Sequence, residues 1–388
     1  MPDRHATEPF TPGQTRHLAL SGLALIAVCY GLARFAYGLF LPAFRATFEF
    51  DAATAGLIAS GSYAAYCVGI VAATFFTPRL GARAVAIAAG VLAAGGTTLI
   101  AAAPNAVLLA LGVMIAGAST GVASPPLADA VARRVVVPRR DRVQTVVNAG
   151  TGLGVMVSGP VGLLAQDEWR IAWAVFAAIA VAVTLWVGVV VPRGRAAVHA
   201  PGAGSESWLP AGARRLLLAA AVMGIATAAV WTFGQDLLTA DGGHDRLFAT
   251  VTWIVLGACG LLGAVAGDLA KRIGAPRAWT GLLVGASAAT VGLGLASHLA
   301  LVALVASAVF GAVYIALTGI LLVWSTRVYE ASPARGVGVV FLALALGQAL
   351  GAPLLGAAAD AVGLPAAFIA AGGVALAGVF IRPPRRGR

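Results

Sequence analysis

The chain has 388 residues, of which 60% are hydrophobic and only 11% charged, and its net charge is +11. A soluble domain has about 25% charged and about 45–50% apolar residues, so this composition excludes most soluble enzymes, nucleic-acid-binding proteins and disordered chains. Most basic residues lie in short clusters between apolar runs, where they indicate the orientation of membrane helices rather than a nucleic-acid site.

Twelve apolar runs predict the fold. A spanning helix needs about 20 apolar residues, and unbroken runs without period-two alternation indicate helices rather than a β-barrel. The runs cover residues 18–42, 53–76, 83–103, 105–128, 143–165, 169–191, 215–239, 247–268, 277–297, 299–325, 336–358 and 362–381. We therefore expect an all-α membrane protein with twelve transmembrane helices.

A polar segment separates the sixth run from the seventh. Residues 192–214 are rich in Pro, Gly and Ser, which is typical of a flexible linker. It divides the chain into an N-terminal six-helix bundle over residues 1–191 and a C-terminal six-helix bundle over residues 215–388. The linker, both tails and the loops on their side carry 22 basic residues against three on the other side. This asymmetry predicts that both termini and the linker are cytoplasmic.

The two halves repeat each other at an offset of 193 residues. Without any gap, this shift places Gly31, Arg79, Arg142, Gly154 and Pro160 on Gly224, Arg272, Arg335, Gly347 and Pro353. Because six is an even number, both halves have the same topology and form a parallel repeat, an arrangement found in transporters. Two such bundles that face each other enclose a path at their seam.

The 6+6 plan and the basic loop after the second run resemble the major facilitator superfamily over the whole chain. That family's loop motif reads roughly G-x-x-x-D-R-x-G-R-R, and residues 74–83 keep its second half but have Pro78 at the acidic position. The resemblance implies gating loops at Arg79, Gly81 and Arg83 in the first half and at Asp268, Arg272 and Gly274 in the second. It also implies that the first, fourth, seventh and tenth helices line the transport path, although the family's arginine in the fourth helix is absent.

Arg34 is the first candidate for substrate binding. It lies about 12 Å from the outer end of the first helix, where a charge costs at least ~2.5–3.5 kcal/mol. Tyr30, Arg34 and Tyr37 recur at α-helical spacing on one face, and an arginine there can bind a carboxylate or phosphate bidentately. The alternative is a structural arginine bonded to backbone carbonyls or to a neighbouring acid.

Polar residues at helical spacing extend the candidate substrate site to three other runs. They are Asn148 and Thr151 in the fifth run, Thr227, Trp231 and Gln235 in the seventh, and Tyr314 and Thr318 in the tenth. Such residues line a path or simply pack helices, because Ser and Thr often bond to carbonyls of their own helix.

Few residues can carry a coupling proton. Asp129 has Arg133 at i+4, and this spacing predicts an ion pair between them. Asp236, near the outer end of the seventh run, is therefore the coupling candidate. Uniport, or antiport driven by the charge of the substrate, remains an alternative. The cysteines and histidines form no cluster, so we expect no catalytic residue, metal or cofactor.

These features predict a secondary-active transporter that moves a small organic solute across the cell membrane (plasma or inner) by alternating access. Gly159-Pro160, part of an exporter-associated motif in the resembled family, favours efflux. Uptake or exchange of a small organic anion held by Arg34 is the alternative, and a non-transporting receptor or an intramembrane enzyme is a disfavoured different class. The expected partners are the solute and the lipid bilayer but not nucleic acid, and the family resemblance implies that a monomer suffices.

Overall fold

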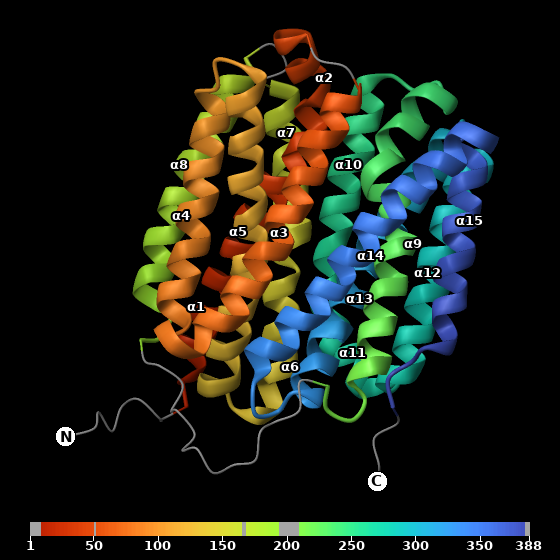
Figure 1. The fold of residues 1–388 in the computed structure, drawn as a ribbon. Coiled ribbons are helices and arrows are strands. Elements are labelled where there is room, and N and C mark those ends of the chain that lie inside the picture. Colours follow the sequence, from red (N-terminus) through yellow and green to blue (C-terminus); the bar gives the residue numbers. More distant parts are fainter. Residues whose placement is uncertain (1–8, 50–51, 165–167, 194–208, 385–388) are drawn as a thin grey trace.

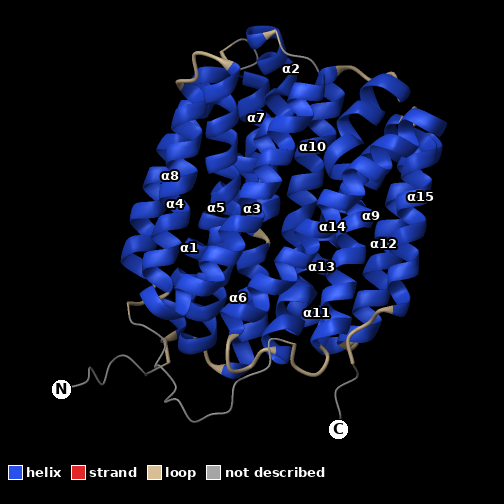
Figure 2. Cartoon of the chain, in the orientation of Figure 1, coloured by secondary structure: helices blue, strands red, loops and turns tan. Residues whose placement is uncertain are grey.

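The computed structural model describes residues 9–49, 52–164, 168–193 and 209–384. Within these residues it contains helices and no strand (Figure 2). The first half comprises α1 (Pro12–Ile26), the π-helix η2 (Ala27–Phe35), α2 (Ala36–Phe48), α3 (Ala52–Leu80), α4 (Ala82–Ala101), α5 (Ala106–Arg134), α6 (Val137–Asn148), α7 (Gly150–Leu164) and α8 (Trp169–Val190). The second half comprises α9 (Ala213–Asp236), η3 (Leu237–Asp241), α10 (Arg246–Gly260), η4 (Leu261–Val265), α11 (Ala266–Arg272), α12 (Ala275–Ala296), α13 (Ala300–Val328), α14 (Pro333–Val362), α15 (Leu364–Ala377) and η5 (Gly378–Phe380).

Each of the twelve predicted runs has a helical counterpart, which confirms the predicted all-α membrane fold. Eleven helical stretches of the described chain are long and apolar enough to cross a membrane, and the last, Leu364–Phe380, is a shorter apolar helix. Five runs are not single regular helices: the first contains η2, the fifth divides between α6 and α7, the seventh enters η3, the eighth contains η4 and the twelfth contains η5. The expected linker falls largely on residues 194–208, which lie outside the described residues.

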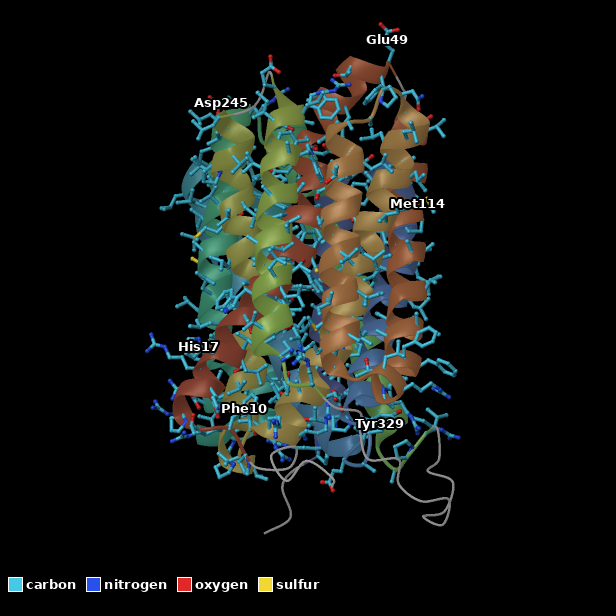
Figure 3. All side chains as sticks on the ribbon, turned by 90° about the vertical axis from the view of Figure 1, so that its left-hand side faces the viewer. Phe10, His17, Glu49, Met114, Asp245 and Tyr329 are labelled. Carbon is cyan, nitrogen blue, oxygen red and sulfur yellow. The ribbon has the colours of Figure 1, made fainter. Side chains whose placement is uncertain are left out.

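The helices before and after residues 194–208 group on opposite sides of the molecule (Figure 1). The described chain begins and finishes at the same end of the bundle, which we call the terminal end. Phe10, His17 and Tyr329 lie toward the terminal end, whereas Glu49 and Asp245 lie at the opposite end (Figure 3). The long helices therefore run between the two ends, and the two groups of helices meet along an interface.

Glycines bring the first helix of each half against a later helix of the same half. A Cβ added to Gly31 in η2 would lie 2.1 Å from the carbonyl carbon of Gly154 in α7. In the second half, a Cβ on Gly224 in α9 would lie 3.0 Å from the Cα of Gly347 in α14. Small residues allow this close approach of two membrane helices. The two pairs are those that the offset of 193 residues relates, so equivalent positions form equivalent crossings.

We expect Gly31→Ala to destabilise the protein, because the new methyl group meets backbone that cannot rotate away. Overpacking of this kind costs about 1–3 kcal/mol. Gly38→Ala is the matched control, since it lies farther along the same predicted span and no atom lies within 4 Å of its added Cβ. Thermal unfolding in detergent should show a lower midpoint for Gly31→Ala and no decrease for Gly38→Ala. Equal midpoints would contradict the close crossing.

Candidate substrate site

The first transmembrane helix changes its winding where the candidate site begins. Residues Ala27–Phe35 form a π-helix between α1 and α2, and such turns are rare and frequent at functional sites. A π-turn holds more residues than an α-turn, so the predicted α-helical stripe of Tyr30, Arg34 and Tyr37 does not continue unchanged. The ring of Tyr37 lies 5.8 Å from that of Phe44 on α2, whereas Arg34 contacts α3.

Aromatic rings surround the guanidinium group of Arg34. Its Cζ lies 4.7 Å from the ring centre of Tyr63, 4.6 Å from that of Tyr66 and 5.2 Å from that of Phe35. Tyr63 and Tyr66 belong to α3 and were not predicted, although two of the chain's six tyrosines at i and i+3 are a signal for a shared helix face. These rings interact with the charge of Arg34 through cation–π contacts.

No carboxylate of the described residues balances the charge of Arg34. The titratable groups that act on it electrostatically are the hydroxyls of four tyrosines, Tyr30, Tyr63, Tyr66 and Tyr314. Its Nη2 atom is buried and has no hydrogen-bond partner. The nearby hydroxyls bond to one another, since Tyr30 Oη lies 3.4 Å from Tyr66 Oη and 3.2 Å from Ser124 Oγ of α5. The site is thus a cation that has one unbonded N–H donor and is surrounded by aromatic rings and their hydroxyl groups.

The aromatic surface continues from Arg34 into the second half of the chain. Phe35 stacks on Trp231 of α9, with ring centres 4.3 Å apart and planes 18° apart. Trp231 also contacts three further rings, those of Trp253, Phe310 and Tyr314, at 5.7, 5.9 and 5.0 Å. We call Phe35, Trp231, Trp253, Phe310 and Tyr314 the aromatic cluster. Tyr30, Arg34, Trp231 and Tyr314 of the predicted set are therefore brought together at the interface between the halves.

The remaining predicted substrate residues lie elsewhere. Thr227 donates to the carbonyl of Met223 at 2.8 Å within its own helix, and Thr151 is buried on α7. Gln235 lines a small pocket inside the second half together with Trp253 and Leu293. Asp236, the coupling candidate, is exposed at the end of α9. Asp129 forms the expected ion pair with Arg133.

One side of α6 connects the two halves toward the terminal end. Its Asp141 accepts a hydrogen bond from Arg327 of α13 at 2.5 Å, and Arg142 lies 3.6 Å from Asp268 of α11. Farther along α6, Thr145 donates to the carbonyl of Ala264 at 2.8 Å. Asn148 donates to Thr318 Oγ1 at 2.6 Å and to the carbonyl of Ile315 at 3.0 Å. We call Asp141, Arg142, Thr145 and Asn148 with these partners the α6 contact row.

The predicted gating loops differ in what they contact. Arg79 donates to the carbonyl of Phe75 in its own helix at 2.7 Å, and Arg83 donates to the carbonyl of Val191 at 2.5 Å within the first half. Gly81 and Gly274, which the repeat relates, both have a positive φ, of 88° and 86°, immediately before α4 and α12. Arg272 is exposed. Among the described gating-loop residues, Asp268 is the one with a contact across the interface.

This arrangement of apolar spanning helices in two groups, with a deep cation at their interface, defines a polytopic membrane transporter. The family described as "Uncharacterised MFS-type transporter YbfB" matches residues 26–382, and the chain belongs to this family of the major facilitator superfamily. It is accordingly a transporter and not an enzyme.

Known proteins with similar sequences or structures agree with this fold. The human organic anion transporter MFSD10 (TETRAN) has a TM-score of 0.73 at 17% identity, covering 96% of this chain and 100% of its own. The Escherichia coli fucose:proton symporter FucP has a TM-score of 0.69 at 18% identity, covering 95% and 97%. The "Transcription regulatory protein OpdE" of Pseudomonas aeruginosa is 26% identical over 274 residues, 65% of each chain. The alignment thus spans just under two thirds of that relative's length.

Proposed function

We propose that the protein carries a small organic anion across the cell membrane, with Arg34 as the group that binds the anionic end. The observation that carries this proposal is the buried, unpartnered Nη2 of Arg34, with no carboxylate of the described residues acting on its charge. A guanidinium at membrane depth is costly unless something neutralises it. Rings bind its charge, while its N–H groups stay available for a carboxylate in the guanidinium plane.

Alternating access follows from the two groups of helices, which we take as the N-terminal and C-terminal bundles. The α6 contact row closes the interface toward the terminal end, and its release would open the path on that side. The proposed orientation, with both termini in the cytoplasm, is supported by the excess of 22 basic residues over three. A monomer is the proposed working unit, because one chain supplies both groups of helices between which the path would run.

The predicted direction of transport rests on a single motif. The efflux prediction depends on Gly159-Pro160, but a Cβ added to Gly159 would lie 2.2 Å from Cγ1 of Ile254 on α10. Helix packing alone therefore explains a glycine at this position. We propose transport of an anion in the direction that its gradient and the membrane potential dictate, which includes both efflux and uptake.

Proteoliposomes provide the test. We expect saturable uptake of at least one small carboxylate from a panel, stimulated when the vesicle interior is made positive and absent from empty vesicles. Lipophilic cations serve as the comparison, and they should not be carried. Saturable flux of cations without any flux of anions would contradict the proposal. Imposing the anion gradient inward and then outward tests the direction, and we expect flux down the gradient in both cases.

A further inference from the structure

A second buried donor lies in the same cluster as Arg34 and has no partner. Trp231 Nε1 is buried and makes no hydrogen bond, as is also true of Arg34 Nη2. The two residues belong to opposite halves, and Phe35 connects them, since its ring stacks on Trp231 and lies 5.2 Å from the Arg34 Cζ. Leaving a buried donor without an acceptor is costly, so two in one place indicate a ligand with two acceptors.

The surroundings of these donors are flat and aromatic. Trp231 touches Phe35, Trp253, Phe310 and Tyr314, and it keeps part of its surface accessible. Aromatic rings prefer offset-stacked or edge-to-face partners over aliphatic ones of similar area. A planar ligand ring fits this surface better than a flexible chain.

The charge of the site limits the charge of the ligand. Among the described residues, Arg34 is the cation that contacts these rings at this depth. One guanidinium neutralises one carboxylate, and a second carboxylate would be buried without a counter-charge. The second acceptor is therefore an uncharged oxygen.

We propose that the ligand of Arg34 is a planar aromatic monocarboxylate with an uncharged hydrogen-bond acceptor across the ring, and that Trp231 recognises both the ring and this acceptor. The inference rests on the proposed anion transport and adds the class of anion. Because the ligand touches Arg34 of the first half and Trp231 of the second, it joins the two halves while it is bound.

Four carboxylates of matched shape test the ring and the acceptor separately. Benzoate and cyclohexanecarboxylate differ in aromaticity, whereas para-acetylbenzoate and para-isopropylbenzoate differ in one carbonyl oxygen at nearly constant volume. Their affinities are measured by calorimetry on the purified full chain. We expect benzoate to bind roughly three- to tenfold more tightly than cyclohexanecarboxylate, and the acetyl compound to exceed the isopropyl compound by a similar factor.

Trp231→Phe separates the two roles, because it keeps a ring and removes the N–H group. It should abolish the preference for the acetyl compound and leave the preference for benzoate. Trp186→Phe is the control, since Trp186 lies exposed on α8, and it should change neither preference. Equal affinities within each pair, or an acetyl preference that survives in Trp231→Phe, would overturn this inference while anion binding stands. If none of the four carboxylates binds but aliphatic carboxylates are carried, the inference fails alone; if no anion is carried at all, the proposed function fails with it.

Discussion

Arg34→Gln is expected to remove anion binding and transport while leaving the protein folded. Truncating one partner of a buried, hydrogen-bonded charge pair costs about 2–5 kcal/mol, which corresponds to roughly a 30- to 5,000-fold loss of affinity. The anion affinity of Arg34→Lys should lie between those of the unmodified protein and Arg34→Gln, because an ammonium group keeps the charge but loses the planar pair of donors. The measurement is the Kd of a transported carboxylate, together with its initial rate of uptake into proteoliposomes.

The thermal midpoint without ligand distinguishes a binding arginine from a structural one. Arg34→Gln loses the cation–π contacts with Phe35, Tyr63 and Tyr66 but also removes a buried charge whose Nη2 atom has no hydrogen-bond partner in the described chain. Because burying an uncompensated charge costs more than these contacts return, Arg34→Gln should leave the midpoint unchanged or raise it. A structural arginine would lower the midpoint on removal. Arg16→Gln is the control on the same transmembrane segment, because Arg16 is exposed on α1. If Arg34→Gln lowers the midpoint and keeps the affinity for anions, Arg34 is structural.

Asp141→Arg is expected to open the interface at the terminal end. The change replaces an ion pair with two like charges, Arg327 and the new arginine, on facing helices α6 and α13. The side chains of Arg327 and Asp141 are 34% and 17% exposed, so the pair is only partly shielded from solvent. We expect a shift of about 1–3 kcal/mol, or roughly 5- to 100-fold, in the balance between closed and open states.

Accessibility of an introduced thiol reports this opening. Thr145→Cys, in a background in which Cys29, Cys67 and Cys259 are replaced by alanine, places the thiol in the α6 contact row, where Thr145 is fully buried. Its labelling by a membrane-impermeant maleimide should accelerate in Asp141→Arg. The double change Asp141→Arg with Arg327→Asp restores opposite charges and should return labelling to the starting rate. Unchanged labelling in the single variant would show that this pair does not hold the interface closed.

The sequence predicts those features of the structure that depend on hydrophobicity and on residue spacing within a helix. Runs of about 20 apolar residues locate the helices because lipid offers their backbone no other hydrogen-bond partners. The offset of 193 residues related Gly31 to Gly224 and Gly154 to Gly347, although it did not show that the two glycines of each half lie against each other. The ion pair between Asp129 and Arg133 could also be predicted, because the two residues lie four positions apart on one helix face.

The unpredicted part depends on contacts between segments far apart in the chain. Nothing in the local sequence distinguishes a π-helix at Ala27–Phe35, and its close approach to α7 at Gly31 involves residues more than 120 positions later. In the sequence, Phe35 is one apolar residue among many. Its stacking partner Trp231 lies nearly 200 positions later, so only the structure shows the contact. Asn148 and Thr318 were both predicted to bind substrate, but spacing within each helix could not show that they bond to each other.

The π-helix also makes this segment tolerant of a change in chain length. A π-turn closes its hydrogen bonds at i→i+5 rather than i→i+4, so it accommodates an extra residue without rotating the helix that follows. Losing one residue from Ala27–Phe35 would therefore return the segment to α-winding while Phe40 and Phe44 keep their contacts with Trp173 and Trp169 of α8, at ring distances of 5.9 and 5.0 Å. Among related transporters, single-residue deletions should be commoner in this segment than in regular α-helix, where each one rotates all following residues by about 100°.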